Sequence, residues 1–129
     1  MKISCRFAEP AEATQFIEWM TSTNNNLFDP SIVKYPSLRT VVVEKDGEPQ
    51  TYVPFHPVLV LESLAQRPGL TPRENAVGLR RLQDTIESTA KQYGMAEVWW
   101  MCADKDLIHF AQQHGYEVIK TAVLRKKVE

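Results

Sequence analysis

The sequence predicts an α/β (α+β) domain built on a mixed sheet with helices on both faces. Three observations lead to that class. A segment rich in β-branched residues precedes the turn signal Asp46-Gly47. A long amphipathic stretch opens at a helix-start signal at Thr71, and a Trp-rich apolar run follows it. Strand and helix patterns therefore alternate along the chain, as a mixed sheet requires.

The bulk composition is that of one globular domain over residues 1–129. The apolar fraction of 43% and the charged fraction of 24% are typical of a soluble protein with a core of ordinary size. A formal net charge of −1 gives no general field to attract nucleic acid or an anionic membrane. The longest apolar run is too short to span a bilayer. We expect a cytoplasmic protein with no nucleic-acid or membrane partner.

The cysteines and histidines suggest no metal site. Cys5 and Cys102 fall in strand-like segments without metal-ligand spacing around them. We expect both to be buried free thiols, which a reducing compartment favours. His109 and His114 lie five residues apart, so they do not share a helix face as a metal-binding i, i+4 pair would.

The first half of the chain is expected to hold strands and short helices in alternation. Residues 2–7 alternate in the manner of a strand, and a helix with an apolar face opens near Pro10. A helical turn is expected within 27–36 and a strand over 38–44. The Asp46-Gly47 dipeptide then predicts a hairpin turn into the next strand.

Residues 48–65 are strand-like but contain three prolines. Proline cannot donate to a strand ladder, so this segment must hold an edge, a bulge or a break. We place the break near His56-Pro57.

The second half opens with the capping box Thr71-Pro72-Arg73-Glu74, which predicts a helix running to Gly94. A buried strand over 98–102 and a short helix from Asp104 or Asp106 to Gly115 follow. One or two strands over 118–128 complete the order. Residues of the long helix recur at a spacing of three or four and form one apolar stripe: Leu79, Leu82, Ile86, Ala90 and Tyr93.

Residues 104–117 carry the most specific motif of the chain. Phe110 and Gly115-Tyr116 are spaced similarly to the Asn-x-x-Ala-x-x-Phe-Tyr-x-x-x-Gly-Phe ending of the GNAT superfamily of N-acyltransferases. The order of elements resembles that family over nearly the whole chain. The resemblance implies a GNAT-like acyl-CoA N-acyltransferase fold. The tyrosine that protonates the departing thiolate in many members falls on Ala111, which cannot transfer a proton.

The family's phosphate loop, Gln/Arg-x-x-Gly-x-Gly/Ala, precedes its long helix and binds the coenzyme A pyrophosphate through backbone N–H groups. Two registers compete in this chain: 66–71, with Thr71 in the last small position, and 73–78, with Ala76 in place of the first glycine. An ordinary capped amphipathic helix would also explain these residues. The resemblance implies contacts with acetyl-CoA or another acyl-CoA by Arg67 and Gly69 in the first register, and by Arg73, Ala76, Val77 and Gly78 in the second.

Two side chains are candidates for the base that accepts a proton from an amine acceptor. Glu62 falls in the strand before the phosphate loop, where many members of the family place such a base. His56 is the weaker alternative, because it sits between Phe55 and Pro57 in an expected turn. Each also has an ordinary explanation, as a solvent-facing strand residue and as a turn residue.

The resemblance implies acetyl transfer to an amine of unknown identity by direct attack on the thioester. The alternative is a catalytically inactive protein of the same fold that acts as a binding or interaction module. Ala111, the altered glycines and the prolines within 49–57 favour that alternative. A homodimer is compatible with the pattern, because the proline-bearing segment and the terminal strand are edges that a partner could cover.

Overall fold

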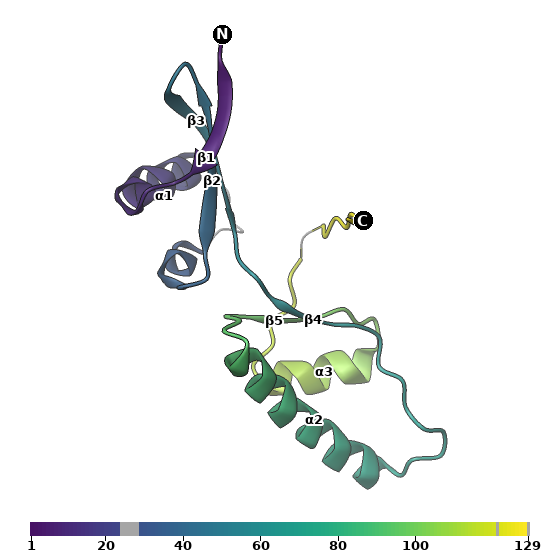
Figure 1. The fold of residues 1–129 in the computed structure, drawn as a ribbon. Helices are drawn as coiled ribbons and strands as arrows, with labels where there is room; N and C mark the ends of the chain where they lie inside the picture. Colours follow the sequence, from purple (N-terminus) through teal and green to yellow (C-terminus); the bar gives the residue numbers. More distant parts are fainter. Residues whose placement is uncertain (24–28, 121, 129) are drawn as a thin grey trace.

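The computed structural model describes residues 1–23, 29–120 and 122–128, and it shows a mixed α/β protein (Figure 1). The expected α/β class is confirmed, but the strands form one antiparallel and one parallel sheet in place of the single mixed sheet expected. In chain order the elements are β1 (Ile3–Phe7), η1 (Pro10–Glu12), α1 (Ala13–Ser22), η2 (Pro30–Lys34), β2 (Arg39–Lys45), β3 (Glu48–Phe55), β4 (Leu59–Leu61), α2 (Pro72–Gln92), β5 (Val98–Trp100) and α3 (Lys105–Gln113), where η denotes a short 3₁₀ helix.

The N-terminal half, residues 1–55, is built on the antiparallel sheet β1-β2-β3. Asp46 and Gly47 have φ angles of 51° and 84°, the left-handed backbone that a two-residue hairpin turn needs. The predicted hairpin is therefore confirmed. The register between β2 and β3 shifts between Val43 and Glu44, opposite Pro49, so one of the three prolines lies at a bulge.

Helix α1 covers one face of this sheet. Phe16 of α1 packs on Val42 of β2 and Tyr52 of β3, and these three side chains are at most 7% exposed. The ring centroids of Phe16 and Tyr52 lie 5.9 Å apart at an interplanar angle of 63°, an edge-on packing that aromatic pairs favour. The expectation of two buried thiols is wrong, because Cys5 points to the other face and is exposed, while Cys102 is half-buried.

The C-terminal half, residues 59–128, contains the parallel pair β4-β5, in which Val60 lies opposite Trp99. Helices α2 and α3 lie together beneath this pair (Figure 1). The predicted start of α2 is confirmed, because the Thr71 hydroxyl accepts a hydrogen bond from the Glu74 amide at 3.1 Å. Tyr93, expected in the apolar stripe, caps the end of α2 and is 67% exposed. No helix in the described ranges has both the length and the apolarity that a bilayer span requires.

A three-residue linker, 56–58, joins the two halves. The predicted break at His56-Pro57 is confirmed, since β3 ends at Phe55 and β4 begins at Leu59. The chain runs on from β3 into β4 without turning back (Figure 1). Strand β4 therefore does not pair with β3, and each is an edge strand of its own sheet.

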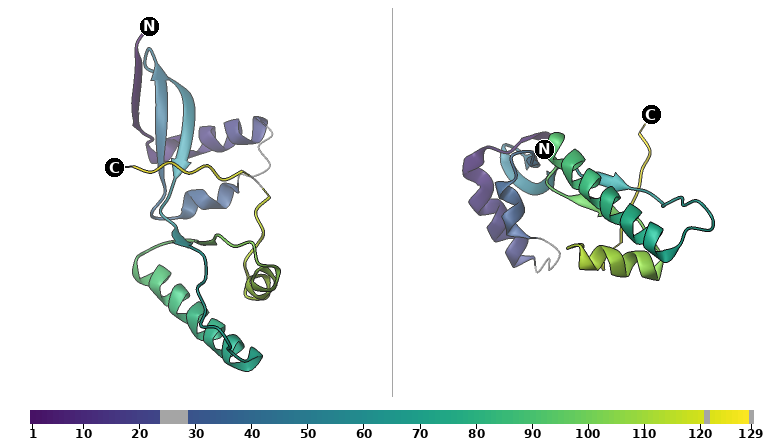
Figure 2. Two further views of the ribbon diagram at one scale, coloured as in Figure 1. Left: turned by 90° about the vertical axis from the view of Figure 1, so that its right-hand side faces the viewer. Right: turned by 90° about the horizontal axis from the view of Figure 1, so that it is seen from below.

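The expected strands over 118–128 are not formed in the described part of that range. The chain leaves α3 as an extended segment that ends apart from the helices (Figure 2). A strand forms only where its N–H and C=O groups find a neighbouring strand, and none adjoins this segment among the described residues. Val118, Leu124 and Val128 are consequently 54%, 94% and 91% exposed.

Candidate functional site

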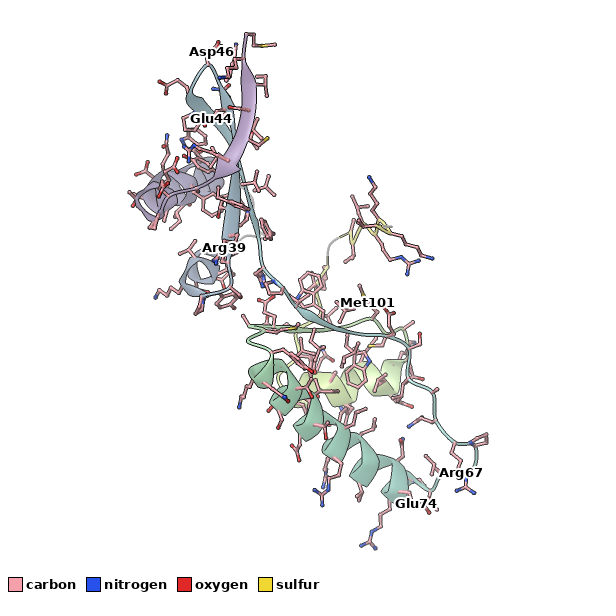
Figure 3. The ribbon with its side chains drawn as sticks, in the orientation of Figure 1. Arg39, Glu44, Asp46, Arg67, Glu74 and Met101 are labelled. Carbon is pink, nitrogen blue, oxygen red and sulfur yellow. The ribbon has the colours of Figure 1, made fainter. Side chains whose placement is uncertain are left out.

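A groove of about 510 Å³ lies where β4 and β5 end, between α2 and α3. In open sheets with parallel strands, ligands bind in the crevice outside the carboxyl ends of those strands. Figure 3 shows Met101 at the end of β5, and Arg67 and Glu74 around the start of α2. The lining residues come from the loop after β4 (Ser63, Leu64, Gln66), from α2 (Pro72, Asn75, Ala76, Leu79), from the segment after β5 (Met101, Cys102, Ala103, Asp104) and from α3 (Asp106, Leu107, Phe110).

The start of α2 forms one end of the groove. The Gln66 side-chain amide donates a hydrogen bond to the side-chain oxygen of Asn75 and ties the loop to the helix. The amides of Glu74 and Asn75 are both bonded to Thr71, and Pro72 has no N–H. Of the first-turn backbone amides of α2, the Arg73 amide is therefore the one that does not bond to Thr71.

The two predicted phosphate registers occupy different environments. Arg67 and Gly69 lie in the loop before α2, where Gly69 has a φ of 84° that favours glycine. Ala76, Val77 and Gly78 lie inside α2, where an amide ordinarily bonds to the carbonyl four residues earlier. Ala76 lines the groove, whereas Val77 is 53% exposed on another side of the helix.

Charge is distributed unevenly along the groove. Arg67 and Arg73 are exposed near the start of α2, where the helix dipole adds partial positive charge. Asp104 and Asp106 line the other end. The Asp104 carboxylate accepts a hydrogen bond from the Leu107 amide at 2.9 Å, so it serves as the N-cap of α3. The groove thus has exposed arginines near the start of α2 and two carboxylates at the start of α3.

The two base candidates lie at opposite ends of β4. Glu62 directly follows β4, is exposed and adjoins the groove residue Ser63. His56 precedes β4, and its Nε2 lies 3.7 Å from Oε1 of Glu97. Its Nδ1 is buried without a hydrogen-bond partner among the described groups. Neither side chain lines the groove, and Glu62 is one residue from it along the chain.

Sequence reasoning missed the cluster around Glu97. The Tyr35 hydroxyl donates to Oε2 of Glu97 at 3.4 Å, and the Trp99 indole donates to Oε1 at 3.0 Å. The Tyr35 and His56 rings meet edge-on, with centroids 5.4 Å apart. Burial, and next the negative charge of Glu97, raise the pKa of Tyr35. The cluster joins residues of both halves of the chain. The sequence marks it only by a carboxylate, Glu97, directly before the apolar strand β5.

The position that the resemblance assigns to a tyrosine acid is filled by Ala111, which is buried in α3. The nearest tyrosine along the chain, Tyr116, donates its hydroxyl to Oε1 of Gln83 at 3.1 Å. Burial raises the pKa of Tyr116. Tyr116 does not line the groove. The described part of the chain also holds no group of three or more His, Cys, Asp and Glu side chains placed to bind a metal ion.

No protein-family model matches this chain, and neither does any curated protein. Solved structures match nearly its whole length. The ribosomal-protein-alanine N-acetyltransferase of Brucella melitensis biovar Abortus 2308 is 9% identical, over 98% of this chain and 100% of that one, with a TM-score of 0.40. AAC(6')-Iy, in complex with the bisubstrate analogue CoA-S-monomethyl-acetylneamine, is 14% identical over 99% of both chains, with a TM-score of 0.40. The integron cassette protein VCH_CASS6 from the mobile metagenome of V. cholerae is 10% identical over 99% and 94%, with a TM-score of 0.43.

At these TM-scores the likeness transfers no site residue from those proteins to this chain. The order of its own elements, from β1 to α3, agrees with the order of strands and helices expected from the sequence.

Proposed function

We propose that this chain is an acyl-CoA-dependent N-acyltransferase that binds acetyl-CoA or another acyl-CoA in the groove at the ends of β4 and β5. The position of that groove carries the proposal. It opens at the carboxyl ends of a parallel strand pair and reaches the N-terminus of a long helix. An elongated ligand with an anionic end and a thioester end fits that arrangement.

The phosphate groups are assigned to the start of α2. The Arg73 amide and the helix dipole supply partial positive charge there, and the side chains of Arg67 and Arg73 supply full charges. Gly69, which has no side chain, lets the phosphate approach the loop backbone. In the second register Ala76, Val77 and Gly78 contribute instead, and Ala76 is the one of them that lines the groove.

The middle of the groove suits the apolar arm of the co-substrate. Leu64, Leu79, Leu107 and Phe110 offer apolar surface, and the paired Gln66 and Asn75 side chains offer polar atoms for amide groups. A mostly apolar site with a few placed polar groups is typical of small-molecule binding. The acidic end at Asp104 and Asp106 then faces the approach of a cationic amine.

The nitrogen of a cationic amine loses two protons in the reaction. The first goes to water and frees the electron pair, and the neutral nitrogen then attacks the thioester carbonyl carbon, a C–N bond forms and the C–S bond breaks. We assign the nitrogen's second proton to Glu62, through water, because Glu62 is an exposed carboxylate that directly precedes the groove residue Ser63. The thiolate takes its proton from solvent, since Ala111 cannot supply one. Rate enhancement then comes mainly from positioning the two reactants.

One observation favours a second function, binding without turnover. Ala111 is buried in α3, and the Tyr116 hydroxyl is already bonded to Gln83 outside the groove. A protein that holds an acyl-CoA in the same groove as a binding module would need neither group. The two functions share the ligand and differ in whether thiol is released.

The test is a thermal unfolding series with acetyl-CoA. A ligand that binds only the folded chain stabilises it by about 2.7 kcal/mol at a hundredfold excess over the dissociation constant. Arg73→Ala should weaken binding, whereas Arg80→Ala, which removes an exposed arginine further along α2 from the helix start, should not. An unchanged midpoint at millimolar acetyl-CoA would reject both functions. Free thiol released with a panel of amines indicates transfer, and its absence despite binding indicates the binding module.

A further inference from the structure

The chain exposes more surface than a compact monomer of its mass. Its accessible surface is 10391 Å², and its mass is 14.8 kDa. A folded monomer of that mass exposes ~7,000 Å², which leaves an excess of roughly 3,400 Å². Each subunit of an obligate homodimer buries roughly 1,000–2,500 Å². The excess is thus larger than the area that one subunit of such a dimer buries, which leaves room for the exposed segment after α3.

The face of the β1-β2-β3 sheet that points away from α1 is one source of the excess. The register places Phe7, Val41 and Val53 in one row across the three strands. Phe7 and Val53 are 61% and 52% exposed, and Phe55, whose ring centroid lies 6.3 Å from that of Phe7, is 48% exposed. No described element packs on this face. We call these four residues, Phe7, Val41, Val53 and Phe55, the open sheet face.

The C-terminal half carries apolar surface of its own. Val60 on β4, Leu70 before α2 and Val77 on α2 are 41%, 39% and 53% exposed. Figures 1 and 2 show this half displaced along the axis of β3 rather than set against the open sheet face. On the open sheet face the exposed apolar side chains are neighbours, and such a contiguous patch commonly marks an interaction site. The two halves thus expose apolar surfaces that do not meet within one chain.

The linker keeps the two surfaces apart. To cover its own sheet face, a chain would have to reverse direction within residues 56–58. It would also break the contact between His56 and Glu97, and that between Tyr35 and Glu97. A second copy of the chain can place its C-terminal half on this sheet face while its linker stays extended and its own Glu97 contacts stay intact. No strand in the described ranges pairs with the outer edge of β3 or of β4, so β3 of one copy can also pair with β4 of the other.

We propose that two copies of this chain form a symmetric dimer by exchanging their C-terminal halves, each half covering the open sheet face of the other copy. Exchange of an identical element is a low-cost route to dimers, because the contacts it uses are those that one closed chain would make. This proposal is independent of the proposed function.

The first test measures mass and size together, by size-exclusion chromatography with light scattering and by small-angle X-ray scattering. The exchanged dimer should have twice the 14.8 kDa mass of the chain and a radius of gyration of about 18 Å. A particle of single-chain mass at micromolar concentration would overturn the proposal. A closed monomer in particular should have a radius of gyration of about 14 Å.

Two variants test the exchange itself. Inserting Gly-Ser-Gly-Ser between Pro57 and Val58 lengthens the linker, so that each half can close on its own sheet, and the folded protein should become monomeric. Val53→Lys should abolish the dimer by placing a charge on the open sheet face, while Ser4→Lys, on the same sheet but the opposite side of β1, should not. If Val53→Lys fails to fold, the oligomeric state of the insertion variant tests the exchange. An insertion variant that stays fully dimeric would show that the halves are not exchanged.

Discussion

Arg6 holds Glu12 through two parallel hydrogen bonds, each 2.7 Å long, from its two terminal guanidinium nitrogens to the two carboxylate oxygens. The Nε of Arg6 donates to Glu44 at 2.9 Å, so the same side chain joins β1 to η1 and to β2. Bidentate pairing is the stronger form of an Arg–carboxylate contact. Tyr52 also donates to Glu12, at 3.3 Å. This cluster fixes the entry of α1 onto the sheet.

The cluster predicts an acid-sensitive contribution to stability. The hydrogen bonds from Arg6, and next that from the Glu9 amide, lower the pKa of Glu12 from 4.5 to about 2. Because the folded-state pKa is depressed, the contribution is complete above pH 4.5 and is lost as the pH falls towards 2. Glu12→Gln should therefore be less stable than the wild type at pH 7, and the difference should shrink below pH 4.5.

Urea unfolding between pH 2 and pH 7 measures that difference. Glu18→Gln, which removes an exposed carboxylate from α1, is the matched control and should follow the wild type. A gap between Glu12→Gln and the wild type that stays constant across the range would contradict the assignment.

Tyr116→Phe should destabilise the C-terminal half. Gln83 is only 5% exposed and accepts the Tyr116 hydroxyl at 3.1 Å. Without that hydroxyl, the Gln83 oxygen is buried without this donor, which costs about 1–3 kcal/mol. Denaturant unfolding at neutral pH checks the value. Tyr93→Phe, at a residue that is 67% exposed, should change little, and equal effects in both variants would speak against the buried bond.

Thr71→Ala should weaken the start of α2. The Thr71 hydroxyl caps the Glu74 amide, and loss of such a cap costs about 0.5–2 kcal/mol. Thr71→Ser keeps the hydroxyl and should retain most of the stability. Unfolding free energies of the two variants settle the point, and an alanine variant as stable as the serine variant would show that the cap contributes nothing.

Features that depend on neighbouring residues were predictable from the sequence. The Asp46-Gly47 hairpin, the Thr71 start of α2 and the Asp104 cap of α3 all rest on bonds between residues at most three apart. The break at Pro57 was likewise predictable, because a proline has no N–H to donate and so interrupts a strand ladder at its own position.

Features that depend on distant residues were not predictable. The contact between His56 and Glu97 joins positions 41 apart in the sequence, and no local pattern marks it. The division into two sheets follows from the direction of the chain at the linker, which proline content alone does not set. The terminal segment has a strand-like composition, but a strand also needs a neighbour. The residues of the groove come from four separate segments that only the fold brings together.

The central claim is that an acyl-CoA binds in the groove between α2 and α3. Titrating acetyl-CoA into isotopically labelled protein, and following the backbone amide resonances by NMR, tests it most directly. We expect shifts confined to residues 63–79 and 101–110, largest near Arg73, with the β1-β2-β3 sheet unchanged. Shifts confined to that sheet, or none at millimolar acetyl-CoA, would contradict it.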